Sequence, residues 1–394
     1  MSLPVNSTAL LEKYSQGQRD FKQCHLAQVQ LQGVRLPGII LSGADLSGLC
    51  LAEADLEGAK LLGTLCKNAN FREANLAHAH LNRINLTDAI LWKTQLMHTC
   101  LGGARLQRTL LLQADLTGAD LSHANLQAAT LCDANLSQAN LTAAQLSGAD
   151  LRGAILWCTN LSGSNAEGAD LTGACLDQAF LKGMVINSQT HIDSKWRLVW
   201  ELVNRDGEAR DLTEADFSQA DLQGVSFRGA RLQRINGEWA NLSYCKLAGA
   251  DLRGANLQFA LLRRANLAGA HLGEALLQGS NLQEADLSHA VLKGAQVDGQ
   301  TQWHPKWQLV WQIMNCQRDA WELQGQDLQQ VYLWKAHLYR ANLQGALLRG
   351  SDLRGANLTD AQLQGADLRG TNFRGAMLAG AELAGAQFDE NTDL

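Results

Sequence analysis

The sequence repeats with a period of five residues, and this period restricts the possible folds more than any other feature. From Phe21 to Ile186 every fifth residue forms one series of 34 positions, of which all but five are leucine. A small residue (Ala, Thr or Ser) stands two residues earlier at 26 of the 33 such positions from Cys24 to Met184. Five residues advance a helix by ~140° beyond a full turn and reverse the face of a strand, so neither element buries these leucines on one side.

The period fits a chain that turns a corner after every five residues. Each leucine then points inward from the middle of a side, and the small residue points inward near a corner. Four sides give a coil of about 20 residues, and coils stack at the ~4.8 Å spacing of paired strands. Further series run from Leu212 to Val297 and from Leu323 to Phe388. The pattern therefore predicts an all-β solenoid with a narrow core of Leu and Ala.

Units such as ADLSG (44–48), ANLSQ (134–138) and ADLRG (149–153) resemble the pentapeptide-repeat family, whose pattern is A(D/N)LXX. The resemblance covers most of the chain and implies a right-handed quadrilateral β-helix, of the type found in cyanobacteria. Leucine-rich repeats need a period of 20–29 residues, which is absent. The family includes cyanobacterial proteins of unassigned role and DNA-mimicking protectors of DNA gyrase, so it defines the fold better than the function.

Two near-identical stretches, KWRLVWELVN (195–204) and KWQLVWQIMN (306–315), interrupt the repeat, each inside a gap of 26 residues. Their apolar residues recur at helical spacing: Trp196, Val199, Trp200 and Val203 in the first, and Trp307, Val310, Trp311 and Met314 in the second. This spacing predicts two short amphipathic helices. Asp193 or Ser194 can cap the first, and Pro305 suits the opening turn of the second. Each helix either covers the coil or offers a surface to a partner.

The predicted organisation has seven parts. Leu10, Leu11 and Tyr14 indicate a weaker helix at the N-terminus. The parts are an N-terminal helical cap (1–20), three β-helix segments (21–186, 212–297 and 323–388), two helical inserts (187–211 and 298–322) and an acidic tail (389–394). The sequence leaves open whether the three segments form one continuous stack.

Composition narrows the class of protein. The start of the chain lacks a basic region followed by an apolar run, and no stretch approaches the ~18 apolar residues of a membrane span. Nine cysteines without paired spacing suggest free thiols in a reducing compartment. We therefore expect a cytoplasmic protein without membrane insertion. A core filled with Leu and Ala leaves no evident pocket, and no phosphate loop, HExxH or GxSxG is present, so we expect no enzyme and no cofactor.

Outward residues that stack at a spacing of 20 form an apolar patch. Ile90 lies under Leu110 and Trp92 under Leu112, where this chain normally carries polar residues. Such a patch either binds a partner or is covered by one of the helices. Further candidate partner-binding residues are the insert tryptophans Trp196, Trp200, Trp307 and Trp311 and the outward aromatics Tyr332, Trp334 and Tyr339. The last three are expected either to pack against the second insert or to bind a partner.

Four residues at one corner have the side chains that bind zinc. His78 stacks with His98, and His80 stacks with Cys100, at a spacing of 20 residues. Histidine and cysteine ligate zinc, but the ligands must converge on the ion. Because a convex corner spreads its side chains apart, we expect solvated surface here and no metal.

These observations favour a non-enzymatic scaffold for protein–protein interaction whose partner is unknown, with a second copy of the chain as one candidate. The alternative is a DNA mimic that modulates DNA gyrase or another DNA-binding protein, which requires a strongly negative surface. The three series carry 13 acidic and 11 basic, 8 and 8, and 5 and 6 residues, within a net charge of −6. No series is acidic enough to favour mimicry, and direct nucleic-acid binding is not expected.

Overall fold

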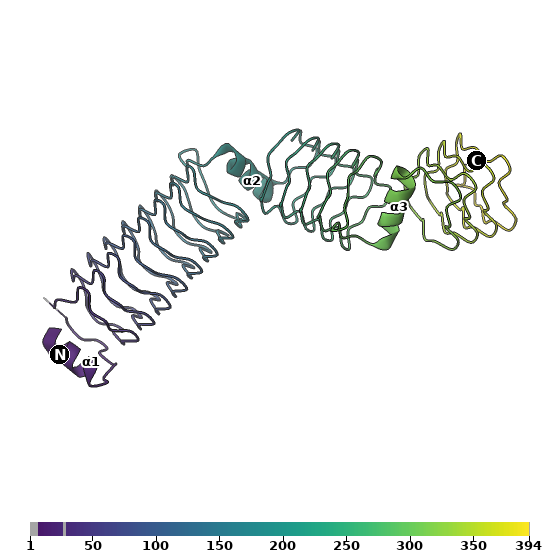
Figure 1. The fold of residues 1–394 in the computed structure, drawn as a ribbon. Helices are drawn as coiled ribbons and strands as arrows, with labels where there is room; N and C mark the ends of the chain where they lie inside the picture. The colour runs from purple at the N-terminus through teal and green to yellow at the C-terminus, as the bar shows by residue number, and fades with distance from the viewer. Residues whose placement is uncertain (1–6, 27–28, 394) are drawn as a thin grey trace. The chain divides into compact units, whose positions relative to one another are not determined.

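The computed structural model describes residues 7–26 and 29–393 (Figure 1). Residues 1–6 of the predicted N-terminal cap, residues 27–28 of the first predicted segment and residue 394 of the predicted tail lie outside the described residues. The chain divides into two compact units, Met1–Asn204 and Arg205–Leu394.

The backbone pairs in parallel with itself at a spacing of 20 residues. Ile90 pairs with Asn70 on one side and with Leu110 on the other, and the next bridge in each direction follows five residues away. Four bridges per 20 residues define a four-sided coil, as the five-residue period predicts. In the part of the chain that the structure describes, these pairings are single-residue bridges and not continuous strands.

The core contains the leucines and small residues that the sequence places inward. Leu91 and Leu111 are 0% and 1% exposed, and Ala89, the small residue two positions before Leu91, is fully buried. Thr94 is also buried, and its Oγ1 donates a 2.8 Å hydrogen bond to the carbonyl of Phe71. Buried hydroxyls are stable only when bonded in this way, which explains how Thr substitutes for Ala at inward positions.

Each corner is a β-turn. Ala44 N–H donates to the carbonyl of Leu41 at 2.9 Å, and Gly43, the third turn residue, has φ of +69°. The outward Asp or Asn at each side also fixes the corner that follows, because its side-chain oxygen accepts from the backbone N–H two residues later. Asp45 accepts from Ser47 N–H in this way at 3.0 Å. This bond accounts for the D/N position of the repeat.

Arginine two residues after an aspartate adds an ion pair to this corner. Arg152 donates from Nε and Nη2 to the two carboxylate oxygens of Asp150, at 2.8 and 2.6 Å. The same bidentate pairing recurs in three further places: Asp251–Arg253, Asp352–Arg354 and Asp367–Arg369. Arg–carboxylate forks of this kind neutralise the acidic residues of the repeat.

Three short helices accompany the coils. The helix α1 (Ser7–Ser15) buries Leu10, and its Tyr14 Oη donates to the carbonyl of Pro37 at 2.7 Å. The inserts form α2 (Ser194–Arg205) and α3 (Pro305–Asn315), as their apolar spacing predicts. His304 caps α3, since its Nδ1 accepts from Lys306 N–H at 3.2 Å.

Within the second unit, the coils after α3 contact the coils before it and α3 itself. His289 N–H donates to the carbonyl of Gln330 at 2.8 Å, and Lys306 of α3 reaches Asp327 at 3.0 Å. At the C-terminal end, Asp393 pairs with Asn372, and its carbonyl accepts from Phe373 N–H at 2.6 Å. The described part of the predicted tail therefore lies against the last coil.

Candidate functional site

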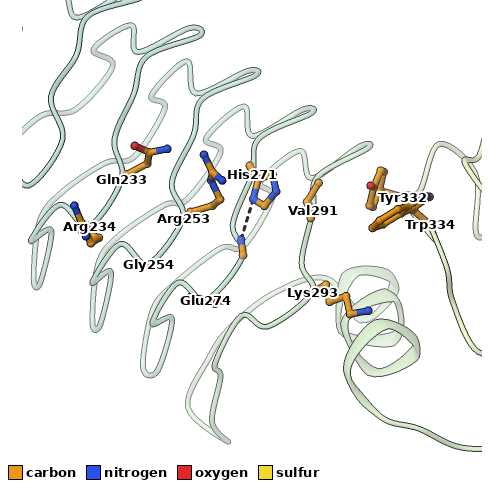
Figure 2. Close-up of a pocket in the computed structure, with 11 residues that line it drawn as sticks. Gln233, Arg234, Arg253, Gly254, His271, Glu274, Val291, Lys293, Tyr332 and Trp334 are labelled. Atoms are coloured by element: carbon orange, nitrogen blue, oxygen red, sulfur yellow. Dashed lines mark hydrogen bonds between the residues drawn. The ribbon is translucent and has the colours of Figure 1, made fainter.

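A groove of about 740 Å³ is open on one face of the second unit (Figure 2). It follows three neighbouring rows of the coil and ends at aromatic residues that come after α3. Its lining comprises Gln233, Arg234, Arg253, Gly254, His271, Gly273, Glu274, Val291, Lys293, Tyr332 and Trp334. All of these residues belong to Arg205–Leu394.

Glycine at position 273 leaves room in the groove for the imidazole of His271. A Cβ atom there would lie 2.9 Å from Cε1 and 3.2 Å from Nδ1 of His271, closer than side chains normally approach. The imidazole therefore lies over the backbone, and Gly273 N–H donates to its Nδ1 at 3.3 Å. Burial, together with the charge of Arg253, lowers the pKa of His271. His271 is accordingly a neutral wall of the groove at pH 7.

Tyr332 and Trp334 close one end of the groove, beyond Val291 and Lys293 (Figure 2). Trp334 is 38% exposed, and Lys335 Nζ lies 4.3 Å from the centroid of its ring. Burial, with the nearby Asp352 carboxylate, raises the pKa of Tyr332. The sequence left open whether these aromatics pack against the second insert or bind a partner. The structure places Tyr332 and Trp334 in the wall of the groove.

The charges around the groove are only partly paired. Arg253 is held by Asp251, and Arg234 lies 2.7 Å from Glu214. Among the described residues, Lys293 has no carboxylate within ion-pair distance. A partner could therefore pair with Lys293 without first displacing an internal ion pair.

This arrangement suits recognition of a chain segment better than chemistry on a small molecule. Tyr332, Trp334 and Val291 supply apolar surface, and Lys293 supplies a charge at its border. Exposed tryptophan and tyrosine in a partly desolvated recess are the residues that most often dominate protein–protein affinity. Within residues 7–26 and 29–393, no group of three His, Cys, Asp or Glu side chains could hold a metal ion.

The predicted apolar patch is present in the first unit. Ile90 and Leu110 pair directly and are 38% and 45% exposed. Trp92 and Leu112 beside them are half-buried. Arg72 and Lys93 lie 4.6 and 4.8 Å from the ring centroid of Trp92, so cations border the patch.

The insert tryptophans bind the coil that precedes their helix. Trp200 Nε1 donates to Met184 O and Trp311 Nε1 to Ala295 O, both at 2.7 Å. Trp196 and Trp307 are buried, at 6% and 8% exposure. These contacts explain why the two inserts share almost the same sequence.

An asparagine completes the same contact in both inserts. The carboxamide oxygen of Asn204 accepts from Gly183 N–H at 2.7 Å, and that of Asn315 accepts from Gly294 N–H at 2.6 Å. The amide nitrogens donate to Leu181 O and Leu292 O. Each asparagine thereby supplies the glycine N–H with the acceptor that the next coil provides in the regular stack, where Gly163 N–H donates to the carbonyl of Lys182.

The remaining predicted residues lie apart from the groove. The rings of His78 and His98 stack with centroids 5.4 Å apart, while His80 pairs with Cys100 in the neighbouring row. Tyr339 is half-buried, with its ring centroid 6.5 Å from that of His337.

Sequence reasoning missed most of the groove. Val291 was the available signal, because it stands in an outward row that otherwise carries Arg231, Asp251 and His271. Gly273 gave no signal by itself, since glycine is frequent throughout the repeat.

Parallel bridges every five residues, paired at a spacing of 20 around a Leu and Ala core, define a four-sided β-solenoid. The family of pentapeptide repeats matches residues 21–183, 210–299 and 322–390, and the chain belongs to this family. No helix in the described part of the chain is long and apolar enough to cross a membrane.

Solved structures of cyanobacterial pentapeptide repeat proteins are similar to this chain. HetL from Nostoc sp. strain PCC 7120, described as involved in heterocyst differentiation regulation, is 28% identical over 74% of this chain and 94% of its own, with a TM-score of 0.37. Rfr23 from Cyanothece 51142 is 26% identical over 47% of this chain and 99% of its own, with a TM-score of 0.17. No curated protein matches the chain.

Proposed function

We propose that this protein is a non-catalytic scaffold, built on a right-handed coil, that binds a protein partner in the groove of its second unit. The observation that carries the proposal is the exposed Trp334 beside Tyr332 and the unpaired Lys293 in a recess of an otherwise regular face. The coil interior is filled by side chains and leaves no room for a substrate. The groove brings together no nucleophile with a base and an oxyanion site, which catalysis would require.

The partner expected at this site is an extended segment with an apolar side chain followed or preceded by an acidic one. The apolar side chain would fill the recess between Val291 and Trp334, and the carboxylate would pair with Lys293. A buried aromatic contact of this kind contributes ≥2 kcal/mol at a typical hot spot, and a border ion pair contributes roughly 0.2–1 kcal/mol. Affinity should therefore depend on Trp334 more than on Lys293.

The proposal can be tested with matched variants. A partner is first captured from the native cell with the full chain and identified, and its affinity is then measured with purified proteins. Trp334→Ser combined with Lys293→Glu should weaken binding by about tenfold or more. Trp239→Ser, which removes a 51% exposed tryptophan of the same unit outside the groove, should leave binding unchanged. Equal affinities for the wild type and the groove variant would refute the proposal.

The DNA-mimic alternative has less support. Mimicry needs uncompensated negative charge that follows the spacing of phosphates. The bidentate Asp–Arg pairs neutralise aspartates at four places along the coil. A supercoiling assay with DNA gyrase separates the two functions, because a scaffold leaves the rate unchanged and a mimic alters it.

A further inference from the structure

Two arginines of the first series differ from the others in having no acidic partner. The series contains six arginines, of which Arg35, Arg72, Arg108 and Arg152 each form an ion pair with an aspartate or glutamate. Arg83 and Arg105 have no carboxylate within ion-pair distance among the described residues. Both of these arginines line the same cavity, of about 430 Å³.

The cavity is built from consecutive coils and presents hydrogen-bond donors. Its lining is Leu65, Arg83, Asn85, Gly103 and Arg105, in which Leu65, Asn85 and Arg105 succeed one another in one bridge row. Asn85 is 6% exposed, and its Oδ1 accepts from the N–H and Oγ1 of Thr87, at 3.2 and 2.8 Å. The carboxamide nitrogen of Asn85 is therefore the group left to bind a ligand, and it can only donate.

Arg83 lies beside Gly103 at the edge of the cavity. Gly103 occupies the corner directly after Arg83 in the stack, and a Cβ there would lie 3.7 Å from Arg83 Cγ. The aliphatic part of Arg83 thus passes over the glycine, and its guanidinium remains exposed. Arginine is well suited to such a site because its planar fork binds carboxylates through two parallel hydrogen bonds.

The surroundings reinforce this positive charge. In the rows next to the cavity, Lys67 and Arg108 add two cations, and Asp88 is the acid that pairs with Arg108. Asp45 precedes Leu65 in the same bridge row, so four basic residues against two acidic ones leave a local charge of +2 on a chain whose net charge is −6. An anionic group approaching this face therefore meets an attractive field.

We propose that this cavity is a second, independent recognition site, which binds an acidic protein segment through Arg83 and Arg105. The segment carries a carboxylate beside an apolar side chain, because Leu65, 44% exposed, forms the apolar part of the lining. A nucleic acid would need a longer track of cations and an aromatic surface for its bases, and the lining offers two arginines and no aromatic ring. The site does not depend on the groove of the second unit.

The test uses the full chain and fluorescent probes of defined composition. The probes are a ten-residue alternating Glu–Leu peptide, its Gln–Leu counterpart and a ten-nucleotide oligothymidylate, each titrated at low salt. The Glu–Leu peptide should bind, and binding should weaken by about tenfold in the double variant R83Q/R105Q. The control R35Q/R152Q removes the same two charges from arginines that are already paired, and it should leave the affinity unchanged.

Each other outcome counts against the site. Tighter binding of oligothymidylate than of the Glu–Leu peptide would indicate a nucleic-acid surface, and equal binding of the Gln–Leu peptide would show that charge is not recognised. Equal losses in R83Q/R105Q and R35Q/R152Q would indicate a general electrostatic effect. Circular dichroism of each variant checks the fold, and Arg83→Lys combined with Arg105→Lys should restore part of the affinity if charge and position both matter.

Discussion

At the residue scale, the corner position with positive φ is the most demanding part of the repeat. Glycine often occupies it, but many corners carry other residues, among them Ala128 with φ of +53° and Ala143 with φ of +56°. A left-handed conformation costs an L-residue other than glycine about 1–2 kcal/mol. The sequence tolerates this cost because neighbouring coils fix the backbone on both sides.

Replacing Ala128 with glycine should therefore stabilise the first unit. The gain is expected to be about 0.5–1 kcal/mol, because glycine removes the strain, and the entropy that it adds to the unfolded chain offsets part of this benefit. The urea midpoint of the first unit measures the change. Gly148→Ala, at φ of +66° with no atom within 4 Å of the added Cβ, is the reverse control and should destabilise the unit. A lower midpoint for Ala128→Gly would contradict this account of the corners.

A second prediction at this scale concerns pH. The hydrogen bond from Arg152 lowers the pKa of Asp150 to about 2. Because the folded pKa lies below the unfolded value near 4, the pair stabilises the fold above about pH 4 and loses this contribution as pH falls toward 2. The urea midpoint of R152Q should therefore fall less between pH 5 and pH 3 than that of the wild type. Parallel pH profiles for the two proteins would refute the assignment.

At the scale of elements, α2 and α3 repeat one set of contacts. In each, a tryptophan indole and an asparagine carboxamide satisfy backbone groups of the coil before the helix. This equivalence explains why KWRLVWELVN and KWQLVWQIMN are so similar in a chain that is otherwise a simple repeat. The sequence that the two helices share therefore maintains the contact between each helix and the coil before it.

Asn315→Ala should destabilise the second unit by about 0.5–1.5 kcal/mol, since it removes the acceptor of the Gly294 N–H and one of the two donors to the Leu292 carbonyl. Gln308→Ala on the exposed side of α3 is the matched control and should change the stability by less than about 0.5 kcal/mol. Chemical denaturation measures both. Similar effects of the two substitutions would show that the hydrogen bonds of the Asn315 carboxamide do not stabilise the contact between α3 and the coil before it.

The fold could be predicted from the sequence because every coil uses the same rule. The five-residue spacing predicted the inward leucines and the 20-residue coil, and the helical spacing of apolar residues predicted the two insert helices, which the structure confirms. The groove could not be predicted, because it depends on the position that Tyr332 and Trp334, in the coils after α3, take relative to His271 and Val291. The sequence identified Tyr332 and Trp334 as outward aromatics. It did not indicate that Gly273 leaves room for the imidazole of His271 in the same groove.

At the scale of the whole molecule, the first unit carries an exposed patch that the groove proposal does not use. Replacing Trp92 and Leu112 with serine should leave the circular dichroism spectrum unchanged and weaken a partner or dimer contact. Sedimentation and binding measurements on the double variant check this. If both the oligomeric state and partner affinity match the wild type, the patch is not an interface.

The central claim is that a partner contacts the groove of the second unit, and site-specific photocrosslinking tests it most directly. A photoreactive phenylalanine analogue replaces Glu274, an exposed residue of the groove lining, in one version of the full chain and Trp239 in another, and both are activated in the native cell. We expect a discrete crosslinked protein from position 274 and none from position 239. The absence of a crosslink at 274, or the same product from both positions, would contradict the claim.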